Sequence, residues 1–561
     1  MLSKDEKPSV NMSPEAAAFW EGAEKGQLVI RTCGDCAKPH FYPRPICPFC
    51  SSPRTEPLVS SGRGTIYSFA PVSGSRRPTA AAIVELAEGP KISSLVVDSD
   101  VHQLAIGEPV EVRFFADGEG RSTLGFTTTA AQRARDYSIR ALKVSSLIDG
   151  EAATNSPAPA EIKTAAIVGA GTMGSGITLS LLAAGIAVHL VDSDAAALDR
   201  ARERIRKILA GDVARGRRTG QDASSMESRV TFGRAIDAVA EADLVIEAVW
   251  EQMSLKRAIF GEIDRYAKGD ALLGSNTSTL DIDQIASATA RPESLIGLHF
   301  FSPAHVMKLL EVIRGPRTSM ETIQRAMALG SRIKKVPVLV RICNGFVGNR
   351  LMIAREEQAG RLLLEGASPQ QVDRVLREFG LPMGTFELQD MAGGIELSYR
   401  HRQETGEENW LVDQLFARGR LGQKTGKGYY RYEPGSSKPL PDREVDDLIV
   451  EGARLKGVDR RVIRDDEVRD RLVFPMINEA AKLIEENIVQ RPSDIDVVWQ
   501  HGYGWPSWKG GPVHWADQIG LRQIRDKLRS FALAHDANLE PANLLNELAN
   551  RDGRFLDQSG R

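Results

Sequence analysis

The chain has 561 residues, too many for a single core, and its 42% hydrophobic and 26% charged residues are ordinary for a globular protein of several domains. Its 72 basic and 74 acidic residues leave a net charge of −2, which gives no electrostatic reason to expect nucleic acid or an anionic membrane as a partner. The N-terminus lacks the apolar core of a secretory signal, and no stretch approaches the ~18 apolar residues of a membrane span, so a cytoplasmic protein is expected.

The first 130 residues have the pattern of a helix, a short strand, a cysteine cluster and then a set of β-strands. Residues 14–25 are amphipathic at helical spacing, and residues 27–31 form a short apolar run. Turn formers separate the later runs, and five short strands with little helix predict a small barrel. The five runs cover 64–70, 80–86, 92–97, 109–115 and 122–128.

Four of the five cysteines lie close together, as Cys33-x2-Cys36 and Cys47-x2-Cys50. Four thiolates at this spacing form a tetrahedral zinc site with no open position, so a structural metal is expected. His40 as a ligand and a reactive thiol pair are weaker alternatives, because four cysteines already complete the coordination shell.

The pattern of predicted secondary structure changes after a low-complexity stretch at 150–160 (GEAATNSPAPA). Strands then alternate with helices, which predicts a parallel α/β sheet, and a mostly helical part follows. Spaced residues of that part recur, for example Asp373 and Asp390 as Asp496 and Asp517, which predicts a duplicated helical domain. The expected boundaries are 12–57 for the helix and zinc ribbon, 58–130 for the barrel, 131–161 for a linker, 162–342 for the α/β domain, 343–433 for the first helical copy, 434–466 for a second linker and 467–550 for the second copy.

A glycine-rich turn follows the first strand of the α/β segment and leads into a helix and a second strand that ends in Asp192. In this setting the glycines let the backbone approach a pyrophosphate at the helix N-terminus, and Asp192 accepts hydrogen bonds from a ribose diol. A 2′-phosphate would meet a like charge there, so NAD is expected rather than NADP. The turn residues predicted to contact the cofactor are Gly169, Gly171, Thr172, Met173 and Gly174.

Residue types suited to alcohol oxidation follow downstream. Removing a hydride from a secondary alcohol requires a base for the hydroxyl proton, and histidine has a pKa near working pH. A carboxylate partner can fix the histidine tautomer and stabilise the imidazolium, while hydroxyl and amide groups can hold the substrate oxygen. His299 is the candidate base because of the motifs that surround it.

Five strings in this part resemble the 3-hydroxyacyl-CoA dehydrogenase family, and specifically the dehydrogenase half of the L-specific peroxisomal multifunctional enzymes. The resemblance covers roughly residues 162–550. The strings are VIEAVWEQMSLK (245–256), HFFSPAHVMKLLEVI (299–313), GFVGNR (345–350), LGQKTGKG (421–428) and HGYGWPSWKGGP (501–512). The fourth is not a phosphate loop, because its spacing is wrong and no Ser or Thr follows the lysine.

The resemblance implies a role for each motif residue. His299 is the expected base and Glu311 its orienting carboxylate, while Ser278 and Asn349 line the hydroxyl or thioester pocket. The residues expected to contact NAD beyond the glycine-rich turn are Asp192, Glu251, Lys256, Ser278 and Ser302. Position 302 is Asn in most monofunctional members and Ser in the peroxisomal branch. The family also implies a Rossmann domain closed by a helical domain that often forms the dimer, with the second copy replacing part of that interface.

The N-terminal strings IRTCGDCAKPHFYPRPICPFC (30–50) and SSGRGTIYSFAPV (60–72) resemble the zinc-ribbon and OB-fold family of acyl-CoA-associated proteins. That resemblance implies a docking role toward acyl-CoA or a thiolase-like enzyme, without chemistry of its own. Nucleic acid is not the expected partner, because no basic stripe with interleaved aromatic residues is present.

The predicted fold is therefore a zinc ribbon and OB-fold barrel, an α/β Rossmann domain and two all-α copies. The predicted activity is NAD-dependent oxidation of (S)-3-hydroxyacyl-CoA to 3-oxoacyl-CoA, without hydratase activity, because nothing here resembles a hydratase domain. Two alternatives remain open, a scaffold that binds acyl-CoA or a thiolase and a dehydrogenase of a non-CoA 3-hydroxy acid. The acyl group and the state of any homo-oligomer are left open.

Overall fold

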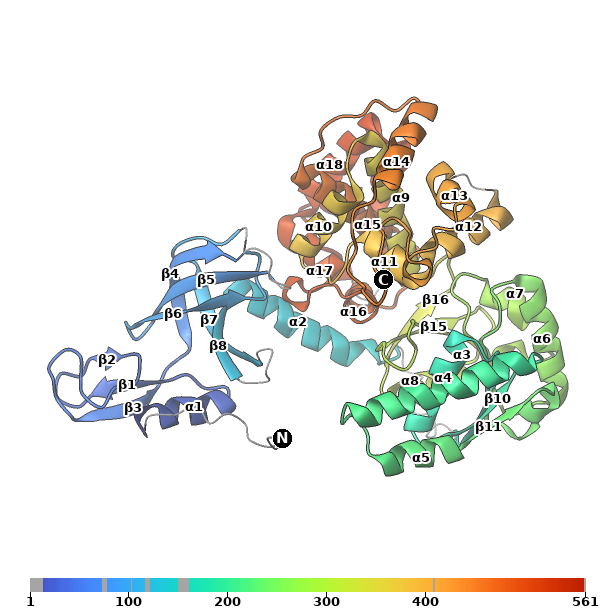
Figure 1. Ribbon diagram of the computed structural model, residues 1–561, viewed down its shortest axis with the longest axis horizontal. Helices are drawn as coiled ribbons and strands as arrows, with labels where there is room; N and C mark the ends of the chain where they lie inside the picture. Colours follow the sequence, from blue (N-terminus) through green and yellow to red (C-terminus); the bar gives the residue numbers. More distant parts are fainter. Residues whose placement is uncertain are drawn as a thin grey trace. The chain divides into compact units, whose positions relative to one another are not determined.

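The computed structural model describes residues 14–72, 78–101, 103–116, 122–149, 161–406 and 409–558. The chain forms two compact units, the first ending at Tyr137 and the second comprising nearly all of the remainder (Figure 1). Among the described residues, no helix combines the length and apolar character that a membrane span requires.

The first unit begins with a small antiparallel sheet that carries the cysteines. The short helices η1 (Pro14–Ala16) and α1 (Ala17–Glu24) precede it, and its strand order is β2-β1-β3. These strands are β1 (Val29–Cys33), β2 (Pro39–His40) and β3 (Thr55–Val59). Cys33 ends β1 and the other three cysteines lie in the connections between the strands, where a metal can hold a sheet with so little core.

A closed five-stranded barrel follows, with the order β4-β5-β6-β8-β7, which confirms the predicted barrel. Alternate side chains of its strands point inward, and Ile66, Val84 and Phe126 are each at most 1% exposed. The strands are β4 (Arg63–Pro71), β5 (Thr79–Leu86), β6 (Lys91–Val97), β7 (Pro109–Ala116) and β8 (Ser122–Thr128).

The predicted linker at 131–161 is helical over its first half, as α2 (Thr129–Ser145). The C-terminal end of α2 and the turn after it are held by Arg491, which donates to the carbonyl oxygens of Val144 at 2.8 Å and Leu147 at 2.9 Å. The low-complexity stretch 150–160 lies outside the described residues.

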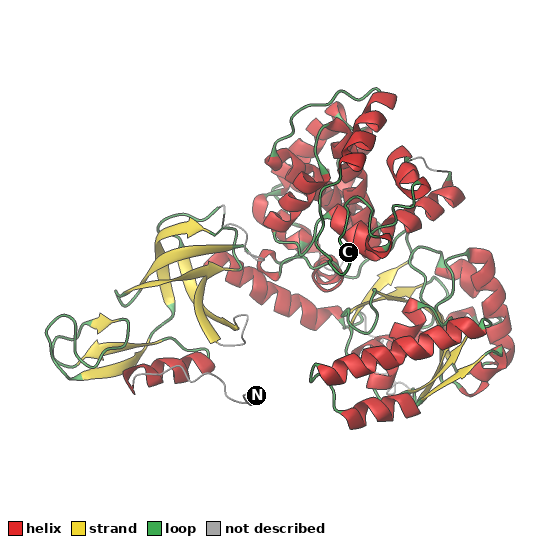
Figure 2. Ribbon diagram, in the orientation of Figure 1, coloured by secondary structure: helices red, strands yellow, loops and turns green. Residues whose placement is uncertain are grey.

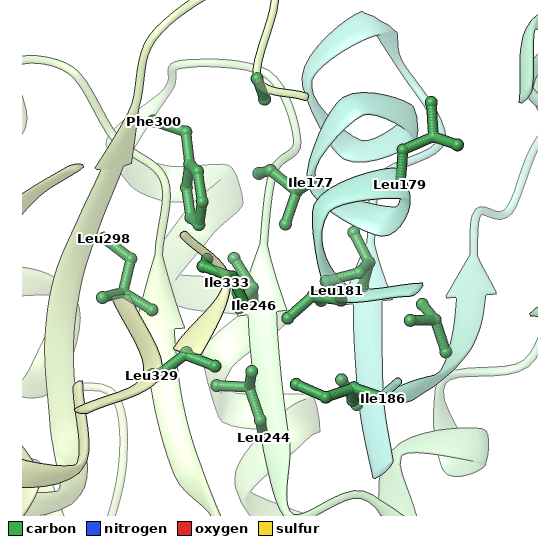
Figure 3. Close-up of a cluster of buried hydrophobic side chains, with 14 of the residues drawn as sticks. Ile177, Leu179, Leu181, Ile186, Leu244, Ile246, Leu298, Phe300, Leu329 and Ile333 are labelled. Atoms are coloured by element: carbon green, nitrogen blue, oxygen red, sulfur yellow. The ribbon is translucent and has the colours of Figure 1, made fainter. Parts of the chain in front are cut away.

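The α/β domain contains one eight-stranded sheet with the order β11-β10-β9-β12-β13-β14-β15-β16. Its strands are β9 (Thr164–Val168), β10 (Ala187–Val191), β11 (Val230–Gly233), β12 (Leu244–Glu247), β13 (Leu272–Ser275), β14 (Leu295–Phe300), β15 (Leu309–Arg314) and β16 (Val336–Arg341). The helices are α3 (Thr172–Ala183), α4 (Ala195–Ala214), α5 (Gly220–Ser228), η3 (Ile236–Glu241), α6 (Met253–Tyr266), α7 (Ile282–Ala286), η4 (Pro292–Ser294) and α8 (Met320–Arg332). Figure 3 shows side chains of α3, β12 and β14 meeting in the core, among them Ile177, Ile246 and Leu298.

The expectation of a parallel sheet is wrong at one position, because β15 pairs antiparallel with β14. Only residues 301–308 connect these strands, whereas a parallel crossover requires a dozen or more residues. The chain therefore turns back directly, and β16 then pairs parallel with β15.

The C-terminal part is almost entirely helical (Figure 2), and helix α14 occupies much of the predicted linker at 434–466. The elements of the first copy are α9 (Gly348–Glu365), α10 (Pro369–Phe379), α11 (Thr385–Ala392), α12 (Gly394–Thr405), α13 (Trp410–Ala417) and η5 (Gln423–Thr425). Those that follow are α14 (Arg443–Leu455), α15 (Asp465–Glu485), α16 (Pro492–Gly502), η6 (Ser507–Lys509), α17 (Pro512–Ile519), α18 (Leu521–Ala534), η7 (Ala537–Leu539), α19 (Asn543–Asn550) and η8 (Phe555–Gln558).

The two copies repeat the same buried carboxylate contacts. Asp373 accepts hydrogen bonds from the N–H groups that begin α11, and Asp496 does so from those that begin α17. Asp390 accepts from two successive N–H groups later in the first copy, and Asp517 does the same in the second. These matched contacts confirm the predicted duplication.

Candidate functional site

The glycine-rich turn between β9 and α3 has the backbone that a dinucleotide requires. Gly169 has φ +111°, and a Cβ there would lie 2.6 Å from the carbonyl oxygen of Ala248, while one on Gly174 would overlap the Gly169 carbonyl. A Cβ on Gly171 would meet nothing within 4 Å, so this side of the turn is open. Thr172 and Met173 form the first turn of α3, which no side chain caps, and its N–H groups are available to a phosphate.

Asp192 lies directly after β10, beside this turn. One carboxylate oxygen accepts a hydrogen bond from the N–H of Ala170 at 2.8 Å, and the other from the N–H of Asp194 at 3.0 Å. The carboxylate is thereby fixed at the carboxyl end of the sheet, where the second strand of a dinucleotide fold places its ribose-binding acid.

The histidine and its carboxylate meet across the antiparallel pair. His299 on β14 and Glu311 on β15 are cross-strand neighbours, and His299 Nδ1 lies 2.7 Å from Glu311 Oε2. Glu311 is fully buried and His299 is 6% exposed. The other Glu311 oxygen accepts from the N–H groups of Val347 and Gly348 at 3.2 and 3.0 Å, so the carboxylate is satisfied and held in one orientation.

Glu251 follows β12 and holds the loop that carries Ser278. Its Oε1 accepts from the N–H of Ser278 at 2.7 Å and from the hydroxyl of Thr277 at 2.5 Å. Burial raises the pKa of Glu251, but the charge of Lys256 and these hydrogen bonds outweigh it and lower the pKa below its ordinary value. The carboxyl is therefore ionised at neutral pH.

Lys256 is 1% exposed and lies between two carboxylates. Its Nζ is 2.7 Å from Glu247 Oε1 and 3.2 Å from Glu251 Oε2. Glu247, which the sequence did not single out, is fully buried and also accepts from the hydroxyl of Ser275 at 2.7 Å. Lys256 thus links the buried acid at the end of β12 to Glu251, which holds the loop of Ser278.

Asn349, in the first turn of α9, lies beside the loop that carries Ser278. Its Nδ2 is 3.5 Å from the carbonyl oxygen of Ser278, and its Oδ1 accepts from the hydroxyl of Tyr503 at 2.6 Å. Ser302 lies exposed in the turn after β14. Sequence reasoning placed Tyr503 in a family motif without a role, and only its contact with Asn349 identifies it.

The four N-terminal thiols fit a zinc ion. All four sulfurs lie within 4.8 Å of one another, and the pairs Cys33–Cys50 and Cys36–Cys47 are both 3.6 Å apart. Bonds of about 2.3 Å to a tetrahedral zinc place sulfurs roughly 3.8 Å apart, close to these values. His40 is buried in β2 and is not part of this group. The cysteines are thus placed to bind one structural metal.

Family models match most of the chain. Residues 164–343 match the NAD binding domain of 3-hydroxyacyl-CoA dehydrogenase, and 345–432 and 468–561 match its C-terminal domain. Residues 20–56 match the rubredoxin-like zinc ribbon domain of ChsH2, and 59–115 match the C-terminal OB-fold domain of ChsH2.

Curated relatives include the peroxisomal bifunctional enzymes of Danio rerio and Homo sapiens. The first is 40% identical over 458 residues, which are 78% of this chain and 63% of the relative. The second is 40% identical over 415 residues, which are 70% of this chain and 56% of the relative. The chain thus spans less than two thirds of each.

Solved structures agree on the fold. A 3-hydroxybutyryl-CoA dehydrogenase from Escherichia coli aligns with a TM-score of 0.60 and 26% identity, over 70% of this chain and 99% of that one. The dehydrogenase part of multifunctional enzyme 1 from C. elegans aligns with a TM-score of 0.55 and 29% identity, over 74% and 96% of the two chains.

Proposed function

Because the chain belongs to the 3-hydroxyacyl-CoA dehydrogenase family, we propose that it oxidises (S)-3-hydroxyacyl-CoA to 3-oxoacyl-CoA with NAD. The observation that carries this proposal is the buried pair of His299 and Glu311, 2.7 Å apart in the sheet that also carries the dinucleotide turn. A buried imidazole with one nitrogen bound to a carboxylate is suited to general-base chemistry.

His299 takes the hydroxyl proton of the substrate at Nε2, since Nδ1 is held by Glu311. Glu311 stabilises the imidazolium that forms, and the N–H groups of Val347 and Gly348 keep its carboxylate from turning away. NAD, when bound, would supply the acceptor for the hydride that leaves the carbon bearing this hydroxyl. Ser278 and Asn349 hold the oxygen as its bond order changes.

The dinucleotide contacts are proposed residue by residue. The turn from Gly169 to Gly174 binds the pyrophosphate and Asp192 the adenine ribose, while Glu251 and Ser278 face the nicotinamide half. Lys256 supports NAD binding by holding Glu251 ionised and in place, because its Nζ is buried between two carboxylates. A contact of Ser302 with the nicotinamide stays a prediction.

We test the base by NADH consumption with acetoacetyl-CoA, comparing the wild type with His299→Ala. Loss of a general base lowers the rate on the order of 10²–10⁴-fold. The matched control is His189→Ala, because His189 lies on β10 of the same sheet and contacts Thr231 instead of the site. An active His299→Ala enzyme refutes the assignment of the base.

If the wild type does not reduce acetoacetyl-CoA, the next substrates to assay are bulkier acyl-CoAs and then free 3-hydroxy acids. Activity with the free acids alone would favour the non-CoA alternative. Inactivity with every substrate while NAD still binds would favour a scaffold.

For the N-terminal module we propose docking of an acyl-CoA or of a thiolase-like enzyme. One support is the pair of matches to ChsH2 domains. The other is a set of apolar residues near the cysteines, Tyr42, Ile46 and Phe49, which are 44–56% exposed. Co-elution with a thiolase at micromolar concentration, lost in Phe49→Asp, supports protein docking. Calorimetric binding of CoA by the same protein supports the other ligand. The cellular location stays a prediction.

A further inference from the structure

Tyr503 brings a side chain of the second helical copy to the site formed by the Rossmann domain and the first copy. It lies in the loop after α16, and its hydroxyl donates to Asn349 Oδ1 at 2.6 Å. The two residues are 154 positions apart in the chain. This contact joins a part of the protein without an assigned catalytic group to one of the proposed substrate-binding residues.

Aromatic packing holds the tyrosine ring in this position. The ring stacks on fully buried Trp499 at 4.5 Å and meets the edge of Phe301 at 5.5 Å. Phe301 in turn lies 4.4 Å from the His299 ring. Gly348 makes the approach possible, because a Cβ there would lie 2.4 Å from the tyrosine ring. The hydroxyl is therefore aimed at Asn349 by rigid neighbours on several sides.

The contact decides which end of the Asn349 amide faces the substrate pocket. An amide has an oxygen that accepts and a nitrogen that donates, and the two ends are nearly equal in size. When Oδ1 accepts the hydrogen bond from the tyrosine hydroxyl, one N–H of Nδ2 donates to the carbonyl oxygen of Ser278 at 3.5 Å. The second N–H of the amide is then left to supply the donor that an oxygen of the substrate requires.

The tyrosine stays a donor over the working pH range. Burial raises its pKa well above the ordinary value, and the negative charge of Glu311 acts in the same direction. The phenol therefore stays protonated at neutral pH and can donate to the Asn349 oxygen.

We propose that Tyr503 is a positioning residue for the reaction, which orients the Asn349 amide so that one N–H group faces the substrate oxygen. The second helical copy thereby contributes to the active site, besides any part in assembly. This inference rests on the proposed dehydrogenase function and deepens it.

The test compares Tyr503→Phe, Asn349→Ala and the double variant in acetoacetyl-CoA reduction by NADH. Phenylalanine keeps the ring that stacks on Trp499 and removes only the hydroxyl. We expect kcat/KM for acetoacetyl-CoA to fall about three- to tenfold in Tyr503→Phe, the loss expected for one neutral hydrogen bond, with KM for NADH unchanged. In the double variant we expect no loss beyond that of Asn349→Ala, because the hydroxyl acts through the amide.

Tyr430→Phe is the matched control. Its hydroxyl also makes a buried hydrogen bond, 2.7 Å from Asp373 Oδ2, within the first helical copy and away from the site. We expect its thermal midpoint to fall at least as much as that of Tyr503→Phe while its kcat/KM stays at the wild-type value.

Three results overturn the inference, all with an active wild type: Tyr503→Phe as active as wild type, losses that multiply in the double variant, or an equal kinetic loss in Tyr430→Phe. A wild type that reduces no 3-oxoacyl thioester instead refutes the proposed function itself.

Discussion

At the scale of single residues, Asp243 ties the start of β12 to the start of β9. Its carboxylate accepts from the N–H groups of Lys163 and Thr164 at 2.9 and 3.0 Å and from the Nζ of Lys268 at 2.9 Å. Burial raises the pKa of Asp243, but these hydrogen bonds outweigh it and lower the pKa to about 2. The stability it contributes is therefore present above the unfolded pKa of about 3.9 and is lost as pH falls toward 2.

Asp243→Asn should accordingly lower the free energy of unfolding of the second unit by about 1–2 kcal/mol at pH 7, allowing for its partial exposure. The difference from wild type should shrink in urea titrations as pH falls from 5 to 3. Asp199→Asn is the control, because Asp199 lies exposed on α4 in an ion pair with Arg202. A difference that is equal at pH 7 and pH 3 would contradict this explanation.

At the scale of elements, one buried aspartate in each helical copy holds the first turn of a later helix. Asp496 is fully buried and accepts from the N–H groups of Val513 and His514 at 2.7 and 3.1 Å. Asp496→Ala leaves both N–H groups without this acceptor, so we expect a loss of about 2 kcal/mol in the free energy of unfolding. Urea unfolding measures it, with exposed Asp447→Ala on α14 as the control. Equal stability of the two variants would show that the contact contributes little.

The antiparallel pair of β14 and β15 brings the proposed base and its carboxylate together. The short connection sets a register in which His299 lies opposite Glu311. A shift by one residue would move these side chains to opposite faces of the sheet and break the pair.

At the scale of the whole molecule, the metal-binding cysteines lie in the first unit, and the residues of the proposed reaction lie in the second. Removal of zinc by a chelator should unfold the ribbon and release one metal per chain, measured by atomic absorption and by proteolysis near the cysteines. Acetoacetyl-CoA reduction should stay within about twofold of the untreated rate, because no cysteine of the ribbon lies in the second unit. Cys33→Ser should give the same result, and Cys343→Ser should retain the zinc. Activity that falls in step with the zinc content would disprove this independence.

Local patterns of the sequence by themselves determined the zinc ribbon, the barrel and the dinucleotide fold of this protein. The spacing of Cys33, Cys36, Cys47 and Cys50 predicted the zinc ribbon, because ligand spacing in a short turn leaves few arrangements. Short β-type runs separated by turn formers predicted the five barrel strands, and the glycine turn with its strands predicted the dinucleotide fold. These features depend on neighbours within a few residues, which the sequence displays directly.

Only the tertiary structure decided the contacts between distant segments. It placed Glu311 opposite His299 by reversing a strand, enclosed Lys256 between Glu247 and Glu251, and brought Tyr503 to Asn349. None of these follows from periodicity, because each depends on how whole elements pack and on which small residue leaves room. Motif resemblance named His299, its partner Glu311 and Asn349, but it assigned no partner to Asn349, because the contact with Tyr503 is set by packing between segments 154 residues apart.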